Sequence, residues 1–87
     1  RLSHPDRKKA AIIFEDMATA YLARGAVNEA SKLARSGLAI LRETEFTMWL
    51  PRYEIIARAL RQQSRQPAVR AYLEDFAMTK RQFASQH

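Results

Sequence analysis

Four stretches of apolar residues spaced three or four positions apart dominate this chain of 87 residues. Such spacing places the apolar side chains of each stretch on one face of an α-helix. Short polar connectors near Gly25, Thr44 and residues 64–66 separate the stretches, and no strand-like alternation or Asn-Gly hairpin turn occurs. Fifteen alanines against two glycines and three prolines also favour helix. The sequence therefore predicts an all-α fold in a single domain, residues 1–87.

The first two stretches predict an antiparallel hairpin over about residues 5–42, because only two or three residues connect them. Its first helix is expected over 5–24, with Ser3 as N-cap, Asp6 in the first turn and Gly25 after the last turn. Its second helix is expected over 27–42. The expected inner faces comprise Ala10, Ile13, Phe14, Met17, Ala18 and Tyr21, and then Val27, Ala30, Leu33, Ala34, Gly37, Leu38 and Leu41. We expect the small residues Ala30, Ala34 and Gly37 to meet the first helix, and Tyr21, Ala30, Leu33 and Leu38 to be buried.

The last two stretches predict a second hairpin over about residues 46–83. Thr44 or Thr47 is expected to cap its first helix, which starts at 47–48 and ends near Gln62; a kink at Leu50, before Pro51, is the alternative. Pro67 suits the first turn of the last helix. The expected inner faces comprise Phe46, Trp49, Leu50, Tyr53, Ile56, Ala57 and Leu60, and then Val69, Tyr72, Leu73, Phe76, Lys80 and Phe83.

The composition excludes several classes of protein. The chain has no cysteine, which excludes a disulfide framework and a thiolate zinc site. No apolar run is long enough to cross a membrane, and residues 1–4 do not resemble a signal peptide, so we expect a cytoplasmic protein without a membrane partner. The chain lacks an initiator Met and is expected to be a piece of a longer protein.

No set of residues has the spacing of a catalytic or metal site. The two histidines, His4 and His87, stand at opposite ends, and the carboxylates Asp6, Glu15 and Asp16 have no converging partner. The two isolated glycines cannot form a phosphate-binding loop. We therefore expect no enzymatic activity, no cofactor and no metal.

The first hairpin resembles a tetratricopeptide repeat (TPR) over the thirty-four residues 11–44. The residues that carry the resemblance are Phe14, Ala18 and Tyr21, then Gly25 at the bend, Asn28-Glu29-Ala30 and Gly37. Ala34 and Arg42 depart from the pattern, where a larger hydrophobe and a proline are usual. The second hairpin keeps only the outline, as terminal repeats often do. Leu50-Pro51-Arg52 and residues 66–70 are also similar to the C-terminal ends of TPR-bearing bacterial transcription regulators.

This resemblance implies a right-handed stack of the two hairpins and a partner-binding groove. Carried over by position, the groove comprises Ile12, Glu15, Thr19, Leu22 and Ala23, with Phe46, Trp49 and Tyr53 added from the second hairpin. Because Glu15 and Thr19 replace the basic and Asn side chains of a carboxylate clamp, the implied ligand is an extended peptide or a packed helix.

Two functions follow, of which the first is preferred. The chain is expected to be a non-catalytic protein- or peptide-interaction module of a bacterial regulatory protein, which associates with itself or a partner chain through Ile12, Leu22 or Trp49. The alternative is a basic nucleic-acid-binding domain of helix-turn-helix type. It rests on the net charge of +6 and on residues 22–34. The basic residues are spread from Arg1 to Arg81, so we interpret them mainly as solvated helix faces, and any nucleic-acid binding as a task of other regions of the parent protein.

Overall fold

The structure, a computed structural model, describes residues 4–85. These residues form four α-helices, α1 (His4–Ala23), α2 (Val27–Thr44), α3 (Leu50–Leu60) and α4 (Pro67–Ala84). Two 3₁₀ turns, η1 (Thr47–Trp49) and η2 (Arg61–Gln63), flank α3. The described part of the chain contains no strand. The predicted all-α class is therefore confirmed, and Ser3, the expected first N-cap, lies outside the described residues.

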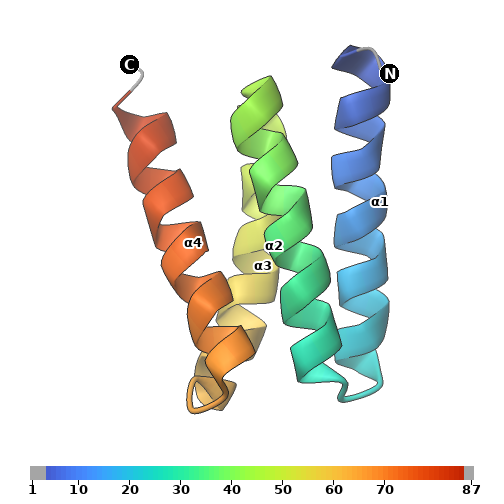
Figure 1. The fold of residues 1–87 in the computed structure, drawn as a ribbon, viewed down its shortest axis with the longest axis vertical. Coiled ribbons are helices and arrows are strands. Elements are labelled where there is room, and N and C mark those ends of the chain that lie inside the picture. Colours follow the sequence, from blue (N-terminus) through green and yellow to red (C-terminus); the bar gives the residue numbers. More distant parts are fainter. Residues whose placement is uncertain (1–3, 86–87) are drawn as a thin grey trace.

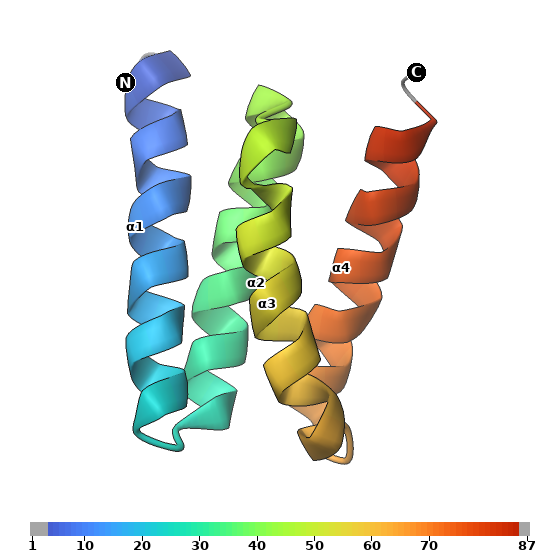
Figure 2. The same ribbon diagram turned by 180° about the vertical axis from the view of Figure 1, so that it is seen from behind.

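The helices pack as two hairpins with α2 and α3 in the middle. In Figure 1, α1 and α4 stand at the two edges, α2 lies between them on the near side, and α3 lies behind α2. Figure 2 shows the opposite side, where α3 lies in front, between α1 and α4. The molecule therefore has one face with the α1/α2 and α2/α4 seams and another with the α1/α3 and α3/α4 seams.

The connectors follow the sequence signals only in part. Gly25 ends the first helix with φ +77°, a left-handed conformation that glycine adopts without strain. Glu45 takes the equivalent position after α2 with φ 54°. The predicted threonine caps are wrong, because Phe46 and Trp49 occupy the N-cap positions of η1 and α3 without a side-chain cap hydrogen bond. The Thr44 hydroxyl donates instead to the carbonyl of Ile40, at 2.8 Å.

The third helix begins with a 3₁₀ turn instead of a kink. Residues 47–49 form η1, and α3 starts at Leu50 with Pro51 in its first turn, where its missing N–H costs no helical hydrogen bond. The helix ends at Leu60, and η2 covers the predicted last residues.

The inner face of α1 differs from the predicted one. Ala11 and Ala18 are fully buried, whereas Ile13 is 56% exposed and Met17 is 42% exposed. Both helix faces carry apolar residues, and packing selects the face with small side chains, since alanine lets α1 approach the central helices closely. Tyr21, expected in the core, is only half-buried.

The remaining core predictions are confirmed only in part, because Val27, Phe46, Trp49, Leu50 and Leu73 are half-buried and pack against the core without being enclosed in it. Leu33 is half-buried, and on α4 the fully buried Thr79 takes the core position that was expected for Lys80, which is exposed. The Thr79 hydroxyl bonds to the carbonyl of Asp75, at 2.7 Å, so it is buried with a partner. Ala30, Leu38, Leu41, Tyr53, Ile56, Ala57, Leu60, Val69, Tyr72, Phe76 and Phe83 are buried as predicted.

Two buried tyrosines connect three helices through backbone carbonyls. The Tyr53 hydroxyl of α3 donates to the carbonyl of Ala11 in α1, at 2.6 Å. The Tyr72 hydroxyl of α4 donates to the carbonyl of Tyr53, at 2.7 Å. Gly37 does not serve the α1/α2 contact as expected, because the space beside it is filled by the Tyr53 ring. These hydrogen bonds fix the position of α3 relative to α1.

Candidate partner-binding face between α1 and α3

Most of the residues predicted to bind a partner belong to the face between α1 and α3, and Figure 2 shows the side of the fold on which these two helices lie. On α1, Lys8, Ile12, Thr19 and Ala23 share one side of the helix by their spacing. Thr19 and Ala23 are exposed, and Ile12, Leu22, Phe46 and Trp49 are half-buried. We call this surface the α1/α3 face. Six of the eight residues predicted to bind a partner are therefore at least partly accessible on this surface.

Two predicted site residues are structural parts of the interior. Tyr53 is fully buried, and its hydroxyl is engaged by the carbonyl of Ala11. Burial, and then the negative charges of Glu15 and Asp16, raise the pKa of Tyr53 above its ordinary value. The neutral hydroxyl therefore serves as a donor to α1. Glu15 is only 8% exposed. A partner docking on this face reaches neither side chain directly.

At one end of the α1/α3 face, two stacked aromatic rings each have a cation beside them. The Phe46 and Trp49 rings lie 5.7 Å apart with an interplanar angle of 18°. Lys8 Nζ lies 5.2 Å from the centre of the Phe46 ring, and the Arg52 guanidinium lies 5.1 Å from that of Trp49. We call these four residues the aromatic–cation ladder. Such contacts contribute about 0.5–1 kcal/mol each at exposed sites, so the ladder orders side chains from α1, from η1 and the residue before it, and from α3.

Sequence reasoning missed the two cations of the ladder. Arg52 follows Trp49 by three positions, a spacing that places it next to the ring on a helix, so this signal was available. Lys8 is brought to Phe46 only by the packing of α1 against the second hairpin, and no local pattern indicates it.

Two buried polar atoms of this region have no hydrogen-bond partner among the described residues. They are Glu15 Oε1 and Trp49 Nε1. The other carboxylate oxygen, Glu15 Oε2, accepts a hydrogen bond from the Thr19 hydroxyl at 3.1 Å. An unsatisfied buried polar group costs about 1–3 kcal/mol. Such groups are exceptions in folded proteins, and each marks a place where stability is given up.

Acidic and histidine side chains do not gather into a metal-binding cluster within residues 4–85. No group of three or more His, Cys, Asp or Glu side chains is placed to hold a metal ion in that part of the chain. The side chains of His4 and His87 fall outside what the structure describes. No helix in residues 4–85 is long and apolar enough to cross a membrane.

Comparison with known proteins gives no match. No family model, no curated protein and no solved structure is significantly similar to this chain.

Proposed function

We propose that the chain is a protein-interaction module of tetratricopeptide type, which binds an extended peptide or a helix of a partner on the α1/α3 face. The observation that carries the proposal is the aromatic–cation ladder at one end of this face, with the exposed Thr19 and Ala23 further along the same side of α1. Aromatic and Arg side chains are enriched in protein interfaces and supply most of their binding energy. Their positions are fixed before binding, which lowers the entropic cost of docking.

The position of α2 favours this function over the helix-turn-helix alternative. A DNA-reading helix must project one side into the major groove. In this fold α2 is a central helix that packs against α1, α3 and α4, with Leu38, Ile40 and Leu41 buried along its second half. This central position of α2 supports a protein partner over DNA for the described residues.

The test uses a peptide-display library and two matched variants. Peptides selected on the wild-type chain are measured against Thr19→Arg and Ala20→Arg, which add the same side chain at adjacent exposed positions. Successive residues of a helix point about 100° apart, so only Thr19→Arg obstructs the α1/α3 face. We expect Thr19→Arg to weaken binding about tenfold or more, a loss of roughly 1.4 kcal/mol, and Ala20→Arg to leave it unchanged.

The fluorescence of Trp49 gives a second readout, because it is the only tryptophan and lies in the ladder. A bound peptide is expected to shift its emission. Equal loss of binding in both variants, or binding without any change in Trp49 emission, would contradict the proposed face.

A further inference from the structure

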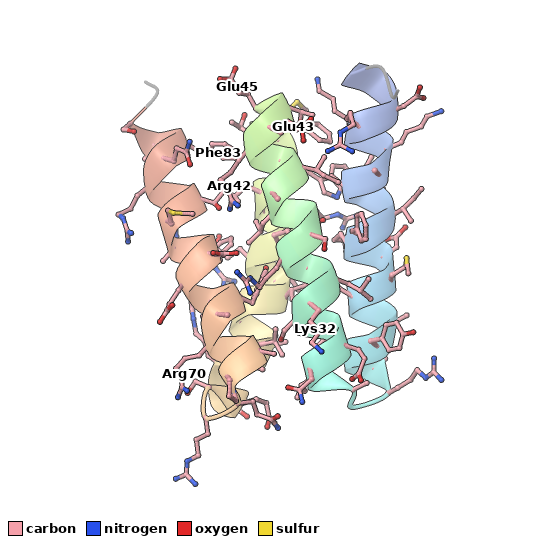
Figure 3. All side chains as sticks on the ribbon, in the orientation of Figure 1. Lys32, Arg42, Glu43, Glu45, Arg70 and Phe83 are labelled. Carbon is pink, nitrogen blue, oxygen red and sulfur yellow. The ribbon has the colours of Figure 1, made fainter. Side chains whose placement is uncertain are left out.

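An open hollow of about 340 Å³ lies along the seam between α2 and α4, on the side of the molecule that faces the viewer in Figure 3 and is away from α3. Figure 3 shows two of its cations, Lys32 and Arg42, near opposite ends of α2. One carboxylate, from Asp75, lines it against three cations, so the lining has an excess of positive charge. The complete lining comprises Lys32, Arg35, Ser36, Ala39 and Arg42 of α2 and Asp75 of α4. We call this surface the α2/α4 seam.

The three cations differ in how they are held. Arg42 Nη1 donates to the hydroxyl of buried Thr79 at 2.7 Å, which fixes Arg42 against α4. Arg35 Nε donates to Asp75 Oδ2 at 2.9 Å. Lys32 is exposed and forms no ion pair with any described residue. One cation of the seam is therefore positioned, one is partly neutralised and one is free for a ligand.

The Arg35–Asp75 pair shows how this seam holds a carboxylate. A guanidinium has five N–H donors in a planar fork, and within the described chain Arg35 uses only Nε toward Asp75. Its two Nη groups therefore remain for a second carboxylate. Lys32 precedes Arg35 by three positions on the same helix, so both cations reach the same stretch of the seam. Ala39, between Arg35 and Arg42, is small and leaves the space between the two guanidiniums open.

We infer that the α2/α4 seam binds an acidic segment of a partner polypeptide. One carboxylate of the segment binds between Lys32 and Arg35, and another binds Arg42. Three cations within about three helical turns of α2, one of them already paired with Asp75, match two or three carboxylates of a short acidic segment, whereas affinity for duplex nucleic acid depends on neutralising many phosphates. This inference does not depend on the α1/α3 face, because the seam lies on the other side of the fold.

The first test removes the carboxylate that competes with the ligand. A fluorescent hexaglutamate peptide is titrated with the chain, and its anisotropy is recorded at low salt. Asp75→Asn frees Arg35, so we expect this variant to bind the peptide about threefold more tightly. Glu74→Gln is the matched control, because it changes the net charge by the same amount at an adjacent exposed position that does not line the seam.

The second test removes the free cation. Lys32→Gln is expected to weaken binding about threefold. Lys9→Gln, at an exposed position of α1, carries the same change of charge and is expected to leave the affinity unchanged. Within each pair the two variants have the same net charge. A difference in their affinity for the peptide therefore reports on the seam and not on net charge.

Three results would overturn the inference. Equal effects within each matched pair would mean that the peptide responds to net charge alone. Displacement of the peptide by a short DNA duplex at an equal concentration would assign the seam to nucleic acid. Absence of binding at about millimolar peptide, the weak limit of specific recognition, would mean that the seam holds no acidic segment.

Discussion

The side chain of Tyr53 occupies the space that a Cβ atom on Gly37 would need. A Cβ built on Gly37 would lie 1.8 Å from the Tyr53 hydroxyl oxygen and 2.6 Å from Cζ of the ring. The ring passes α2 at this glycine, and its hydroxyl donates a hydrogen bond to the carbonyl of Ala11 in α1. A glycine in the interior of a helix costs about 0.5–1 kcal/mol relative to alanine, so the fold gives up helix stability in α2 to connect α3 with α1.

Gly37→Ala is therefore expected to destabilise the chain by about 1–3 kcal/mol through overpacking. The gain in helix propensity offsets part of this cost. Urea denaturation measures the change in the free energy of unfolding.

The control for this prediction uses a Tyr53→Leu background. The atoms of Tyr53 nearest to the Cβ position are its hydroxyl oxygen, Cζ and Cε1, which leucine lacks, so in that background Gly37→Ala is expected to raise stability by about 0.5–1 kcal/mol. The sign of the effect should reverse between the two backgrounds. The same loss in both would show that Tyr53 is not the obstacle.

The two buried tyrosines predict a loss of stability at alkaline pH. Burial is the main cause that raises the pKa of Tyr53 and of Tyr72 above the ordinary value of about 10. In the unfolded chain both ionise near pH 10, whereas in the fold they stay neutral to higher pH. Their contribution to stability is thus complete below about pH 10 and decreases as the pH rises beyond it.

At about pH 11 the expected loss is about 1.4 kcal/mol for each tyrosine. Unfolding free energies at about pH 8 and 11 are compared for the wild type and the Tyr53→Phe/Tyr72→Phe variant. The two proteins differ only at these two hydroxyl groups, so the difference between their pH dependences isolates Tyr53 and Tyr72. An identical decrease in the two proteins would disprove this contribution of the tyrosines.

Glu15 is expected to reduce the stability of the fold. Its Oε1 atom is buried without a described partner, and only Thr19 bonds to the other oxygen. Glu15→Met removes the unsatisfied group with a side chain of similar length, and we expect a gain of about 1 kcal/mol in urea denaturation. Stability given up in this way is typical of functional sites.

A double-mutant cycle with Thr19→Val separates the carboxylate from simple packing. Thr19→Val is expected to cost about 0.5–1.5 kcal/mol in the wild type, because it removes the remaining hydrogen bond of Glu15. In the Glu15→Met background it should cost almost nothing. Additive effects would mean that the two side chains do not interact.

Local sequence signals predicted the boundaries of the first, second and last helices closely, but they placed the ends of the third helix two or three residues too far out and did not predict the helix faces. The first and last helices were expected over residues 5–24 and 67–83, and the structure has them at His4–Ala23 and Pro67–Ala84. The agreement is close because the signals at Gly25 and Pro67 act on the residues within one helical turn of them. On α1 both the alanine face and the Ile13 face are apolar. Only packing against the central helices decides between them, and that information is not local.

The candidate site was predicted in outline and not in its contacts. The position of Trp49 followed from helical spacing and the resemblance to a tetratricopeptide repeat. The bond from Tyr53 to Ala11 joins residues 42 positions apart, and Lys8 reaches Phe46 from a different hairpin. Such contacts depend on how the hairpins pack, which no pattern within one helix specifies.

The structure changes which residues of α1 are expected to form an interface between two copies of the chain. Ile12, Leu22 and Trp49 were the residues expected in a dimer interface, but Leu22 and Trp49 pack against the core of their own chain. The large exposed apolar side chains of α1 are Ile13 and Met17. Met17 also lines a mainly apolar hollow between α1 and α2. Its other lining residues are Tyr21, Glu29, Lys32 and Leu33. An interface between copies, which we expect, should therefore include Ile13 and Met17.

Light scattering coupled to size exclusion, from about 1 to 100 μM, tests self-association over the range of weak protein dimers. The wild type is expected to increase in mean mass with concentration, because burying Ile13 and Met17 removes apolar surface from water. Ile13→Lys introduces a charge that the interface must desolvate, so this variant should remain a monomer. Ile55→Lys is the matched control, since Ile55 is 59% exposed on α3, and it should associate like the wild type. A monomer mass for the wild type at every concentration, or loss of association in Ile55→Lys alone, would contradict an interface on α1.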